Sequence, residues 1–366
     1  MIKVLIVDDS ALVRKLFGGV FGNGPEFEVQ FAPNGLEALE QLKVFKPSVI
    51  TLDVQMPGMN GLDCLDRIML EKPTPVVMVS SLTAEGAEAT LDALRLGAVD
   101  FVTKPGGAVS MRMAEFAPVL LEKVRAAATV KVRASARLRE RIRHRASISN
   151  TTAPRIPRPK DQAPALAPEA GERLVVVGTS TGGPPALEAL LTALPAGFPW
   201  PIVIAQHMPA SFTGALARRL DGICNIHVQE VRSPTALKPG TAYIGRGDAD
   251  VIVTRRAGAL FAIAVPAEAD YPWHPSTNRL VRSAAEHVTP RQLVGILMTG
   301  MGDDGAAAMV ELRALGGTTI AEAEETAVIW GMPGELVKRG GAEWVEPLAG
   351  IADRLMSLVP IHAANS

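Results

Sequence analysis

Three residue types that together catalyse acyl transfer follow three separate apolar runs in the second half of the chain. Ser180 lies in a glycine-rich turn, His207 comes directly after PIVIAQ, and the acid pair Asp303-Asp304 follows QLVGILMTGMG. A serine hydroxyl is a weak nucleophile until a base removes its proton, and the base needs an acid that fixes its orientation. If the fold brings the three runs together, these residues can act as nucleophile, base and acid.

The turn around Ser180 allows three interpretations. The string Gly178 to Gly182 satisfies G-x-S-x-G, the pattern of a nucleophile turn, but it could equally be a tight turn of small residues or a phosphate cradle. It lacks the G-x-x-x-x-G-K-[ST] pattern of a nucleotide-binding loop. His207 could be structural, and Asp303-Asp304 could cap a helix that begins at Gly305. Rival candidate bases are His227, His274 and His287.

Acidic side chains and one lysine follow the apolar runs of the first half. Asp8 and Asp9 come after KVLIV, Asp53 ends SVITLD, and Lys104 ends AVDFVTK. Crowded carboxylates repel one another and favour a hard divalent cation such as Mg2+. Beside such a cation a carboxylate can attack phosphorus, the lysine can hold a phosphoryl oxygen, and Ser80 can hydrogen-bond the new group. Each residue alone also has an ordinary role, such as a helix cap for Asp8, but their joint position favours chemistry.

Both halves alternate short apolar runs with helix-like stretches, and this alternation must position the residues above. Val- and Ile-rich runs bounded by Gly or Pro are typical of strands buried on both faces. Strand–helix repetition predicts an α/β fold with two doubly wound parallel-sheet domains. Because ligands bind beyond the carboxyl ends of the strands in such sheets, the candidate residues all lie where chemistry is expected.

Composition separates the halves. Residues 123–171 are basic and then rich in Pro and Ala, which predicts a flexible linker. A stretch that overlaps its start, Val119 to Arg145, could form a basic helix. The chain is therefore expected to comprise a domain at 1–122, the linker, and a second domain at 172–362.

The overall composition narrows the class of protein. The 366-residue chain is 48% hydrophobic and 20% charged, which is ample for two buried cores. Its 37 basic and 38 acidic residues give a formal net charge of −1, which argues against a chain that coats nucleic acid. Two cysteines cannot build a disulfide framework or a four-cysteine zinc site. With no signal-peptide core and no run of about 18 apolar residues, we expect a cytoplasmic protein.

Residues 1–122 resemble the receiver domain of two-component response regulators, through the strings VLIVDDS, TLDVQMPGMNGL, VMVSS and GAVDFVTKP. The resemblance implies a flavodoxin-like fold in which Asp53 accepts a phosphoryl group from a sensor histidine kinase. The implied Mg2+ ligands are Asp8, Asp9, Asp53 and the backbone carbonyl of Gln55. The implied switch residues are Ser80, Phe101 and Lys104. Phe101 stands where many receivers have Tyr.

Residues 172–362 resemble the catalytic domain of the chemotaxis protein-glutamate methylesterases, through VGTSTGGP, IVIAQHMP, YIGRGDAD and LMTGMGDDGA. The resemblance implies a Rossmann-like domain, and the order Ser, His, Asp differs from the order in α/β-hydrolases. The implied nucleophile, base and acid are Ser180, His207 and Asp304. Many relatives have Asn where this chain has Asp303, which supports Asp304 over its neighbour. The backbone N–H groups of Thr181 and Met301 are candidate oxyanion donors.

Together the two resemblances imply an enzyme that hydrolyses glutamate methyl esters, and deamidates specific glutamines, on chemoreceptors during sensory adaptation. The implied partners are methyl-accepting chemoreceptors and a sensor histidine kinase, without nucleic acid, and the protein would be peripheral to membrane receptors only. Mg2+ would serve the receiver, and the esterase chemistry would need no cofactor. Phosphorylation of Asp53 would rearrange Ser80 and Phe101 and move away a receiver that shields Ser180.

Two other outputs remain open from the residues alone. The basic run at 123–145 would fit a nucleic-acid-binding output, although no helix-turn-helix pattern follows residue 172. The GTSTGG turn would fit a nucleotide- or phosphate-binding module. Labelling by a serine-directed acylating probe would favour the esterase, whereas nucleotide-dependent stabilisation would favour the cradle.

Overall fold

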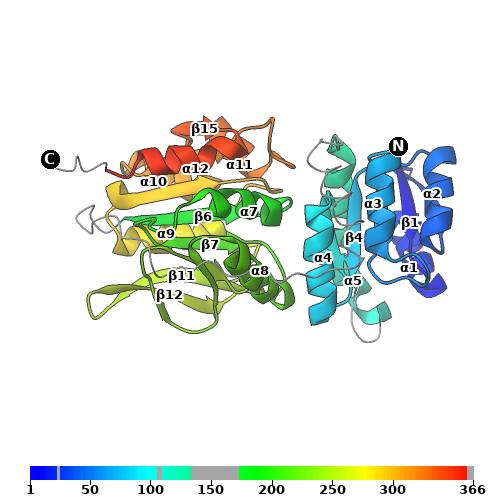
Figure 1. Ribbon diagram of the computed structural model, residues 1–366, viewed down its shortest axis with the longest axis horizontal. Helices are drawn as coiled ribbons and strands as arrows, with labels where there is room; N and C mark the ends of the chain where they lie inside the picture. Colours follow the sequence, from blue (N-terminus) through cyan, green and yellow to red (C-terminus); the bar gives the residue numbers. More distant parts are fainter. Residues whose placement is uncertain (23–24, 105–108, 133–172, 361–366) are drawn as a thin grey trace. The chain divides into compact units, whose positions relative to one another are not determined.

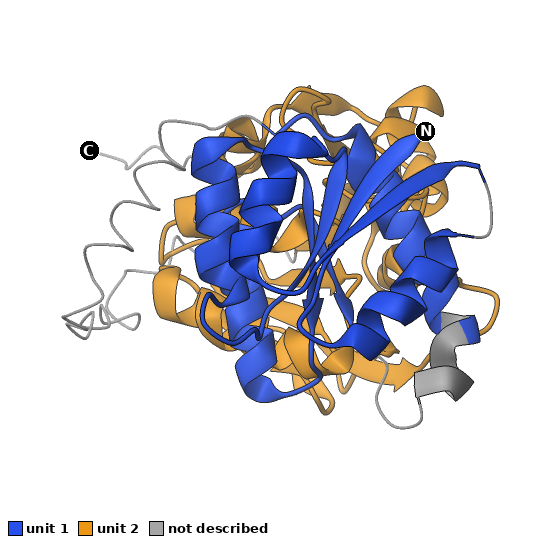
Figure 2. Cartoon of the chain, turned by 90° about the vertical axis from the view of Figure 1, so that its right-hand side faces the viewer, with its two compact units in different colours: residues 1–155 blue, residues 156–366 orange. Residues whose placement is uncertain are grey.

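The computed structural model describes residues 1–22, 25–104, 109–132 and 173–360. The chain divides into two compact units, residues 1–155 and 156–366 (Figure 1; Figure 2). Each unit is built on its own parallel sheet with helices on both faces, which confirms the predicted α/β class. Most of the predicted linker, residues 133–171, lies outside the described residues.

Unit 1 carries a five-stranded parallel sheet in the order β2-β1-β3-β4-β5. This is the flavodoxin-like order, which reverses between β1 and β3 and opens a crevice beyond their carboxyl ends. Every residue of β3 and β4 is buried, which explains their apolar runs. The elements are β1 (Ile2–Val7), α1 (Ala11–Phe21), β2 (Phe27–Ala32), α2 (Gly35–Val44), β3 (Val49–Asp53), α3 (Gly61–Glu71), β4 (Val76–Ser80), α4 (Ala84–Arg95), β5 (Asp100–Thr103) and α5 (Val109–Thr129).

Side-chain caps fix where the helices of unit 1 begin. The side chain of Ser10 accepts a backbone N–H in the first turn of α1, and Asn34, Asn60 and Thr83 do the same for α2, α3 and α4. Asp8, considered above as a cap, instead accepts the N–H of Ser10 at 2.9 Å. Its carboxyl therefore stays at the end of β1, where the acidic cluster is expected.

The last helix of unit 1, α5, extends past the expected domain boundary at residue 122 and ends at Thr129. It packs against β3, β4 and β5, and its fully buried residues Leu120, Val124 and Ala127 recur at helical spacing. The start of the stretch Val119 to Arg145 thus completes the core of unit 1, and its residues from 133 onward lie outside the described part.

Unit 2 carries a seven-stranded parallel sheet in the order β15-β14-β13-β6-β7-β10-β8. The strands that lead into the candidate catalytic residues, β13, β6 and β7, are direct neighbours. The elements are β6 (Leu174–Thr179), α7 (Gly183–Ala193), β7 (Ile202–Gln206), α8 (Ala210–Ile223), β8 (His227–Val231), β9 (Thr235–Ala236), β10 (Thr241–Gly245), β11 (Ala249–Arg256), β12 (Ala259–Pro266), α9 (Thr277–His287), η2 (Pro290–Gln292), β13 (Leu293–Leu297), α10 (Ala306–Ala314), β14 (Thr318–Glu322), α11 (Met332–Lys338), β15 (Trp344–Glu346) and α12 (Leu348–Ser357).

An antiparallel sheet of three strands, β11-β12-β9, was not expected from the strand–helix alternation. Its main hairpin turns through Ala257 and Gly258, whose φ angles are 47° and 85°. A two-residue hairpin turn of this kind needs positive φ at both positions, which glycine adopts freely. Because α9 packs against β11, this small sheet helps to position the helix whose start lies beside Asp304.

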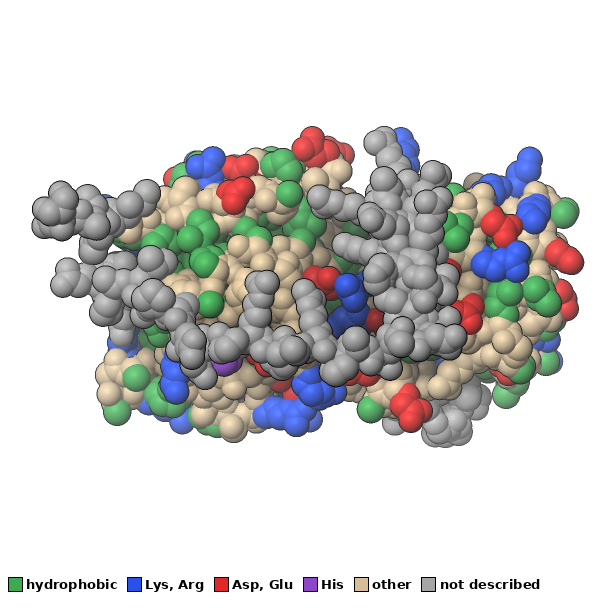
Figure 3. Space-filling model, viewed as in Figure 1, with side chains coloured by type: hydrophobic (Ala, Val, Ile, Leu, Met, Phe, Trp, Pro, Cys, Tyr) green, Lys and Arg blue, Asp and Glu red, His purple; other side chains and the backbone are tan. Residues whose placement is uncertain are grey.

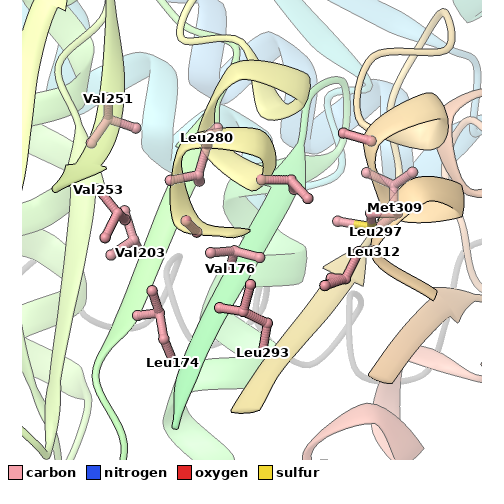
Figure 4. Packing of buried hydrophobic residues seen from close by; sticks show 14 of the residues in the cluster. Leu174, Val176, Val203, Val251, Val253, Leu280, Leu293, Leu297, Met309 and Leu312 are labelled. Atoms are coloured by element: carbon pink, nitrogen blue, oxygen red, sulfur yellow. The ribbon is translucent and has the colours of Figure 1, made fainter. Parts of the chain in front are cut away.

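The core of unit 2 lies between the central strands and the helices α9 and α10 (Figure 4). Leu174 and Val176 of β6 and Leu293 and Leu297 of β13 project to the same side as Leu280 of α9, and all five are fully buried. Alternate strand residues face one side of a sheet, which gives this spacing of two. Burial of each such side chain stabilises the fold by about 1.5–3 kcal/mol, so the strands that carry the candidate residues are firmly packed.

The surface carries charges of both signs. Figure 3 shows Lys, Arg, Asp and Glu side chains interspersed over the face that it presents, in keeping with the net charge of −1. In the described part of the chain, every helix is too short or too polar to cross a bilayer.

Candidate functional site

Ser180 follows β6 in a turn that is hydrogen-bonded to the loop after β13. Its backbone N–H donates to the carbonyl of Thr299 at 3.0 Å, and its own carbonyl accepts the N–H of Gly183 at 2.8 Å. Gly182 has a φ of 77°, and a side chain there would meet Val328 at 2.7 Å. The turn therefore needs glycine at this position, and it presents the half-buried Ser180 at the edge of the sheet.

His207 follows β7, the neighbour of β6. Its backbone N–H donates to the carbonyl of Thr179 at 3.0 Å, which continues the β6–β7 ladder to the ends of both strands. The side-chain amide of Gln206 donates to the carbonyls of Ser180 at 3.1 Å and of His207 at 3.0 Å. The buried Gln206 thus ties the serine turn to the histidine loop.

Asp304 is the partner of the imidazole. Its Oδ2 lies 2.8 Å from Nε2 of His207 and accepts the N–H of Thr277 at 2.6 Å, while Oδ1 accepts from Asn278 N–H and Ser276 Oγ, both at 3.0 Å. Burial opposes the charge, but the hydrogen bonds from His207 and from the start of α9 outweigh it and lower the pKa of Asp304. The carboxylate is thus held as a buried anion by the N-terminus of a helix.

The pairing fixes which histidine nitrogen can act as a base. Since an ionised carboxylate only accepts hydrogen bonds, Nε2 of His207 donates to Asp304, and in the neutral form of the ring the lone pair is on Nδ1. Nδ1 is buried and has no hydrogen-bond partner among the described residues, Ser180 included. An unliganded enzyme often shows a long base–nucleophile contact that tightens when substrate binds. The contact of Nε2 with Asp304 therefore leaves Nδ1 as the ring nitrogen without a partner among the described residues, and a role for it as the base toward Ser180 stays a prediction.

The structure separates the two neighbouring acids. Asp303 is partly exposed and pairs with Arg339 at 2.6 Å, whereas Asp304 is 2% exposed and faces His207. Neither caps α10 with its side chain, because that helix begins after Gly305. Among the rival histidines, His274 donates from Nδ1 to Oδ1 of Asp250, 2.9 Å away.

The candidate oxyanion donors lie on the two segments that meet at Ser180. Thr181 follows the serine directly and is buried, and Met301 follows Gly300. A side chain at Gly300 would come within 2.8 Å of Ser180 Cβ, so this loop passes directly beside the nucleophile. The positions of the two N–H groups toward an oxyanion stay a prediction.

Several residues at this edge were not anticipated from the sequence. Ser276 caps α9, a role that its place before a helix-like stretch could have indicated, but its contact with Asp304 has no local signal. Trp273 lies parallel to His207, with ring centroids 6.2 Å apart, and fills the space beside Gly302. Thr299 and Glu322 lie beneath the serine turn and are considered below.

In unit 1, the structure gathers the predicted acidic cluster. One carboxylate oxygen from each of Asp8, Asp9 and Asp53 lies within 4.8 Å of the others. Nζ of Lys104 lies 2.7 Å from Asp53 and 3.0 Å from Asp8. Burial raises the pKa of Asp53, an effect that Lys104 offsets in part, whereas the hydrogen bonds to Asp53 and Asp8 overcome burial and raise the pKa of Lys104. Oxygen donors crowded in this way suit Mg2+.

Of the three predicted switch residues, Lys104 belongs to this cluster, whereas Ser80 and Phe101 contact other groups. Ser80 is fully buried, and its hydroxyl lies 3.2 Å from the carbonyl of Ser81 and 3.1 Å from that of Gly86. The ring of Phe101 is buried, with Nζ of Lys123 5.2 Å from its centroid. The backbone N–H of Gln55 donates to Asp53 at 3.3 Å. In this structure the side chains of Ser80 and Phe101 therefore occupy one defined conformation each, and their movement on phosphorylation stays a prediction.

Fold and site together define a class: a phosphoacceptor-type α/β unit joined in one chain to an α/β unit that gathers Ser, His and Asp at adjacent strand ends. The model of the CheB methylesterase family matches residues 175–355, and that of the response regulator receiver domain matches residues 4–114. The chain belongs to the CheB methylesterase family and carries a receiver domain, which confirms the resemblances described above.

Curated relatives match over the full length. A protein-glutamate methylesterase/protein-glutamine glutaminase 2 of Rhodopseudomonas palustris (strain BisB18) is 58% identical over 369 residues, covering 100% of both chains. Protein-glutamate methylesterase/protein-glutamine glutaminase 3 of Rhodospirillum rubrum is 51% identical over 356 residues, 97% of this chain and 95% of the relative. The crystal structure of the Thermotoga maritima CheB methylesterase catalytic domain is 36% identical, with a TM-score of 0.50, covering 52% of this chain and all of that one. Family membership favours the esterase over the nucleic-acid and nucleotide outputs.

Proposed function

We propose that this chain is a phosphorylation-activated protein-glutamate methylesterase and protein-glutamine glutaminase that acts on methyl-accepting chemoreceptors during chemotactic adaptation. The observation that carries the proposal is the buried His207–Asp304 pair, which leaves Nδ1 without a partner among the described residues, at the end of the strand next to the one that leads to Ser180. Full-length relatives that bear these activity names support the substrate class. We propose a cytoplasmic protein that meets membranes only through its receptor substrates.

In the proposed mechanism, Oγ of Ser180 attacks the ester carbonyl carbon while Nδ1 of His207 takes the hydroxyl proton. The carbonyl electron pair moves to the oxygen, which the N–H groups of Thr181 and Met301 hold. The tetrahedral species collapses, Nδ1 returns the proton to the leaving oxygen, and methanol departs. Asp304 stabilises the imidazolium throughout because its charge lies 2.8 Å from Nε2.

Water completes the cycle. It attacks the acyl-enzyme as Nδ1 of His207 takes one of its protons, and the proton returns to Oγ of Ser180 when the acyl–oxygen bond breaks. The products are a glutamate side chain and free enzyme. For a glutamine substrate the same steps release ammonia in place of methanol.

The receiver supplies the control in this proposal. The carboxylate of Asp53 attacks a phosphoryl group carried by a sensor histidine kinase, and Lys104 holds one of its oxygens. Asp8, Asp9 and the carbonyl of Gln55, with Asp53, would hold Mg2+, which when bound neutralises phosphoryl oxygens. Ser80 and Phe101 then change their contacts, and the phosphorylated receiver no longer holds the esterase rate low, as the unphosphorylated receiver does.

The esterase is tested by methanol release from receptor membranes carrying methylated glutamates. Ser180→Ala should lower turnover by several orders of magnitude, as the loss of a triad nucleophile does. The matched control is Ser357→Ala, because Ser357 lies exposed at the end of α12. Undiminished methanol release by Ser180→Ala, at unchanged thermal stability, would refute the nucleophile assignment.

The control is tested on the full chain with acetyl phosphate and Mg2+. The wild-type esterase rate should rise, while Asp53→Asn should keep the basal rate and show no increase. Equal rates with and without the phosphodonor in the wild type would refute regulation by the receiver.

A further inference from the structure

A buried carboxyl that the reaction does not use lies behind the serine turn. Glu322, the last residue of β14, is 0% exposed, and its Oε2 accepts the backbone N–H of Thr299 at 2.8 Å. Pairing of β14 with β13 fixes this contact, since Ala321 stands opposite Leu297 in the register. Among the described residues, no Lys, Arg or His forms an ion pair with Glu322. Its carboxyl therefore has no positive partner.

Thr299 links this carboxyl to the nucleophile. Its carbonyl accepts the N–H of Ser180 and the hydroxyl of Thr179, both at 3.0 Å, and its own hydroxyl lies 2.8 Å from the carbonyl of Thr181. Thr299 thus forms hydrogen bonds with three successive residues, Thr179, Ser180 and Thr181. Whatever holds the backbone of Thr299 also holds Ser180.

The surroundings of the second oxygen of Glu322 accommodate a protonated carboxyl. Oε1 lies 3.1 Å from the hydroxyl oxygen of Thr326, which accepts the N–H of Leu348 at 3.0 Å and lies 3.2 Å from the carbonyl of Ala323. A hydroxyl has one hydrogen to donate. If Thr326 donates to Ala323, a protonated Oε1 donates to Thr326 and every group is satisfied. An ionised Glu322 would take that hydrogen and remain a buried, unpaired charge, which is costly.

The ion pairs on the elements packed around β14 are made with groups other than Glu322. Glu346 of β15 stands beside Glu322 in register, and Arg354 of α12 binds Glu346 at 2.8 Å. On α10 and α11, Glu311 pairs with Arg282, Glu335 pairs with Lys338 and Arg339, and Arg313 donates to the carbonyls of Gly340 and Ala342. Burial outweighs the two hydrogen bonds and raises the pKa of Glu322.

We propose that Glu322 is a positioning residue, kept as a neutral carboxylic acid, that holds Thr299 and through it Ser180 in the reactive geometry. The inference rests on the proposed esterase function. Ionisation of Glu322 would place a negative charge behind the Ser180 turn. That charge would repel the negative charge that develops on the substrate oxygen during the reaction. Activity should therefore decline as pH rises through the raised pKa of Glu322 and the carboxyl loses its proton.

Two substitutions in the full chain separate the neutral acid from other roles. Glu322→Gln keeps an acceptor for Thr299 and a donor for Thr326 and cannot ionise, so its kcat at neutral pH should stay within about twofold of wild type. It should also lack the decline in activity that accompanies ionisation of Glu322. Glu322→Leu leaves the Thr299 N–H unpaired, so kcat should fall about tenfold or more at an unchanged KM. The matched control Glu346→Gln should leave the pH profile unchanged.

Thermal unfolding against pH tests the protonation state without any substrate. A folded-state pKa above the unfolded value means that the folded wild type binds more protons between the two, so its stability falls as pH rises through that window. The Tm of Glu322→Gln minus that of wild type should therefore grow with pH. If the difference is flat, or if Glu322→Gln loses as much kcat as Glu322→Leu, the proposal is overturned. If wild type releases no methanol, the proposed function fails, and the Tm series alone decides whether Glu322 is neutral.

Discussion

Replacing Asp304 by Asn tests the catalytic assignment most directly, because every contact of this carboxylate is known. Oδ2 accepts from His207 and Thr277, and Oδ1 accepts from Ser276 and Asn278. An asparagine amide in either orientation turns an NH2 toward a backbone N–H that needs an acceptor. One buried donor is left unpaired, which costs about 1–3 kcal/mol of folding stability.

The catalytic loss should be larger than the loss of stability. A neutral amide cannot stabilise the imidazolium and can hold His207 in the wrong tautomer, and the same change in a comparable triad lowers kcat about 10⁴-fold. That factor corresponds to about 5 kcal/mol in the activation barrier, at 1.36 kcal/mol per tenfold. Methanol release gives kcat, and chemical denaturation gives the free energy of unfolding.

The pH dependence of stability gives a second measure of the same residue. The folded-state pKa of Asp304 is lowered, so its ionised form stabilises the fold above the usual carboxyl range, and this contribution disappears as pH falls through the folded-state pKa. The stability difference between wild type and Asp304→Asn should therefore shrink in acid. The control Asp303→Asn breaks only a partly exposed pair with Arg339 and should change kcat less than about twofold. An Asp304→Asn enzyme within tenfold of wild type would refute the assignment of Asp304 as the acid.

Two further substitutions probe the surroundings of each site. Gly300→Ala brings a methyl group within 2.8 Å of Ser180 Cβ, so kcat should fall about 100-fold, the effect of a 1 Å misplacement, with circular dichroism as the check on folding. Lys104→Met removes the ammonium 2.7 Å from Asp53 and 3.0 Å from Asp8, so acetyl phosphate should no longer accelerate methanol release while the basal rate persists. A normal Gly300→Ala enzyme, or a Lys104→Met enzyme that still responds, would contradict these contacts.

The positions of Ser180, His207 and Asp304 could be expected from the sequence because strand–helix alternation sends parallel strands to one edge. In parallel α/β sheets, functional residues lie beyond the carboxyl ends of the strands. This can be predicted without knowing the order of the strands in the sheet. The order decides which ends are adjacent, and only the structure shows β6 between β7 and β13. Adjacency then follows from backbone hydrogen bonds such as His207 N–H to Thr179.

The support of Asp304 could not be read from local patterns. Ser276 and Thr277 are ordinary residues for the start of a helix. Their contacts with Asp304 join two segments that are separated along the chain by more than one element. The chain reaches α9 through the antiparallel hairpin of β11 and β12, which the alternation rule does not contain. By contrast, the extension of α5 to Thr129 has a local signal, since Leu120, Val124 and Ala127 follow helical spacing before the prolines begin.

The two sites place a buried carboxylate in opposite electrostatic settings, and this difference accounts for their different chemistry. Asp53 lies beside Asp8, and burial raises its pKa even though Lys104 binds it, so its negative charge is only partly compensated by the protein. Asp304 is surrounded by donors, and its pKa is lowered. A carboxylate with uncompensated charge can share a cation and react with phosphorus, whereas one saturated by N–H groups can only orient and stabilise its neighbour. These settings support the roles that we propose for the two residues, Asp53 as the phosphoryl acceptor of unit 1 and Asp304 as a fixed anion for His207 in unit 2.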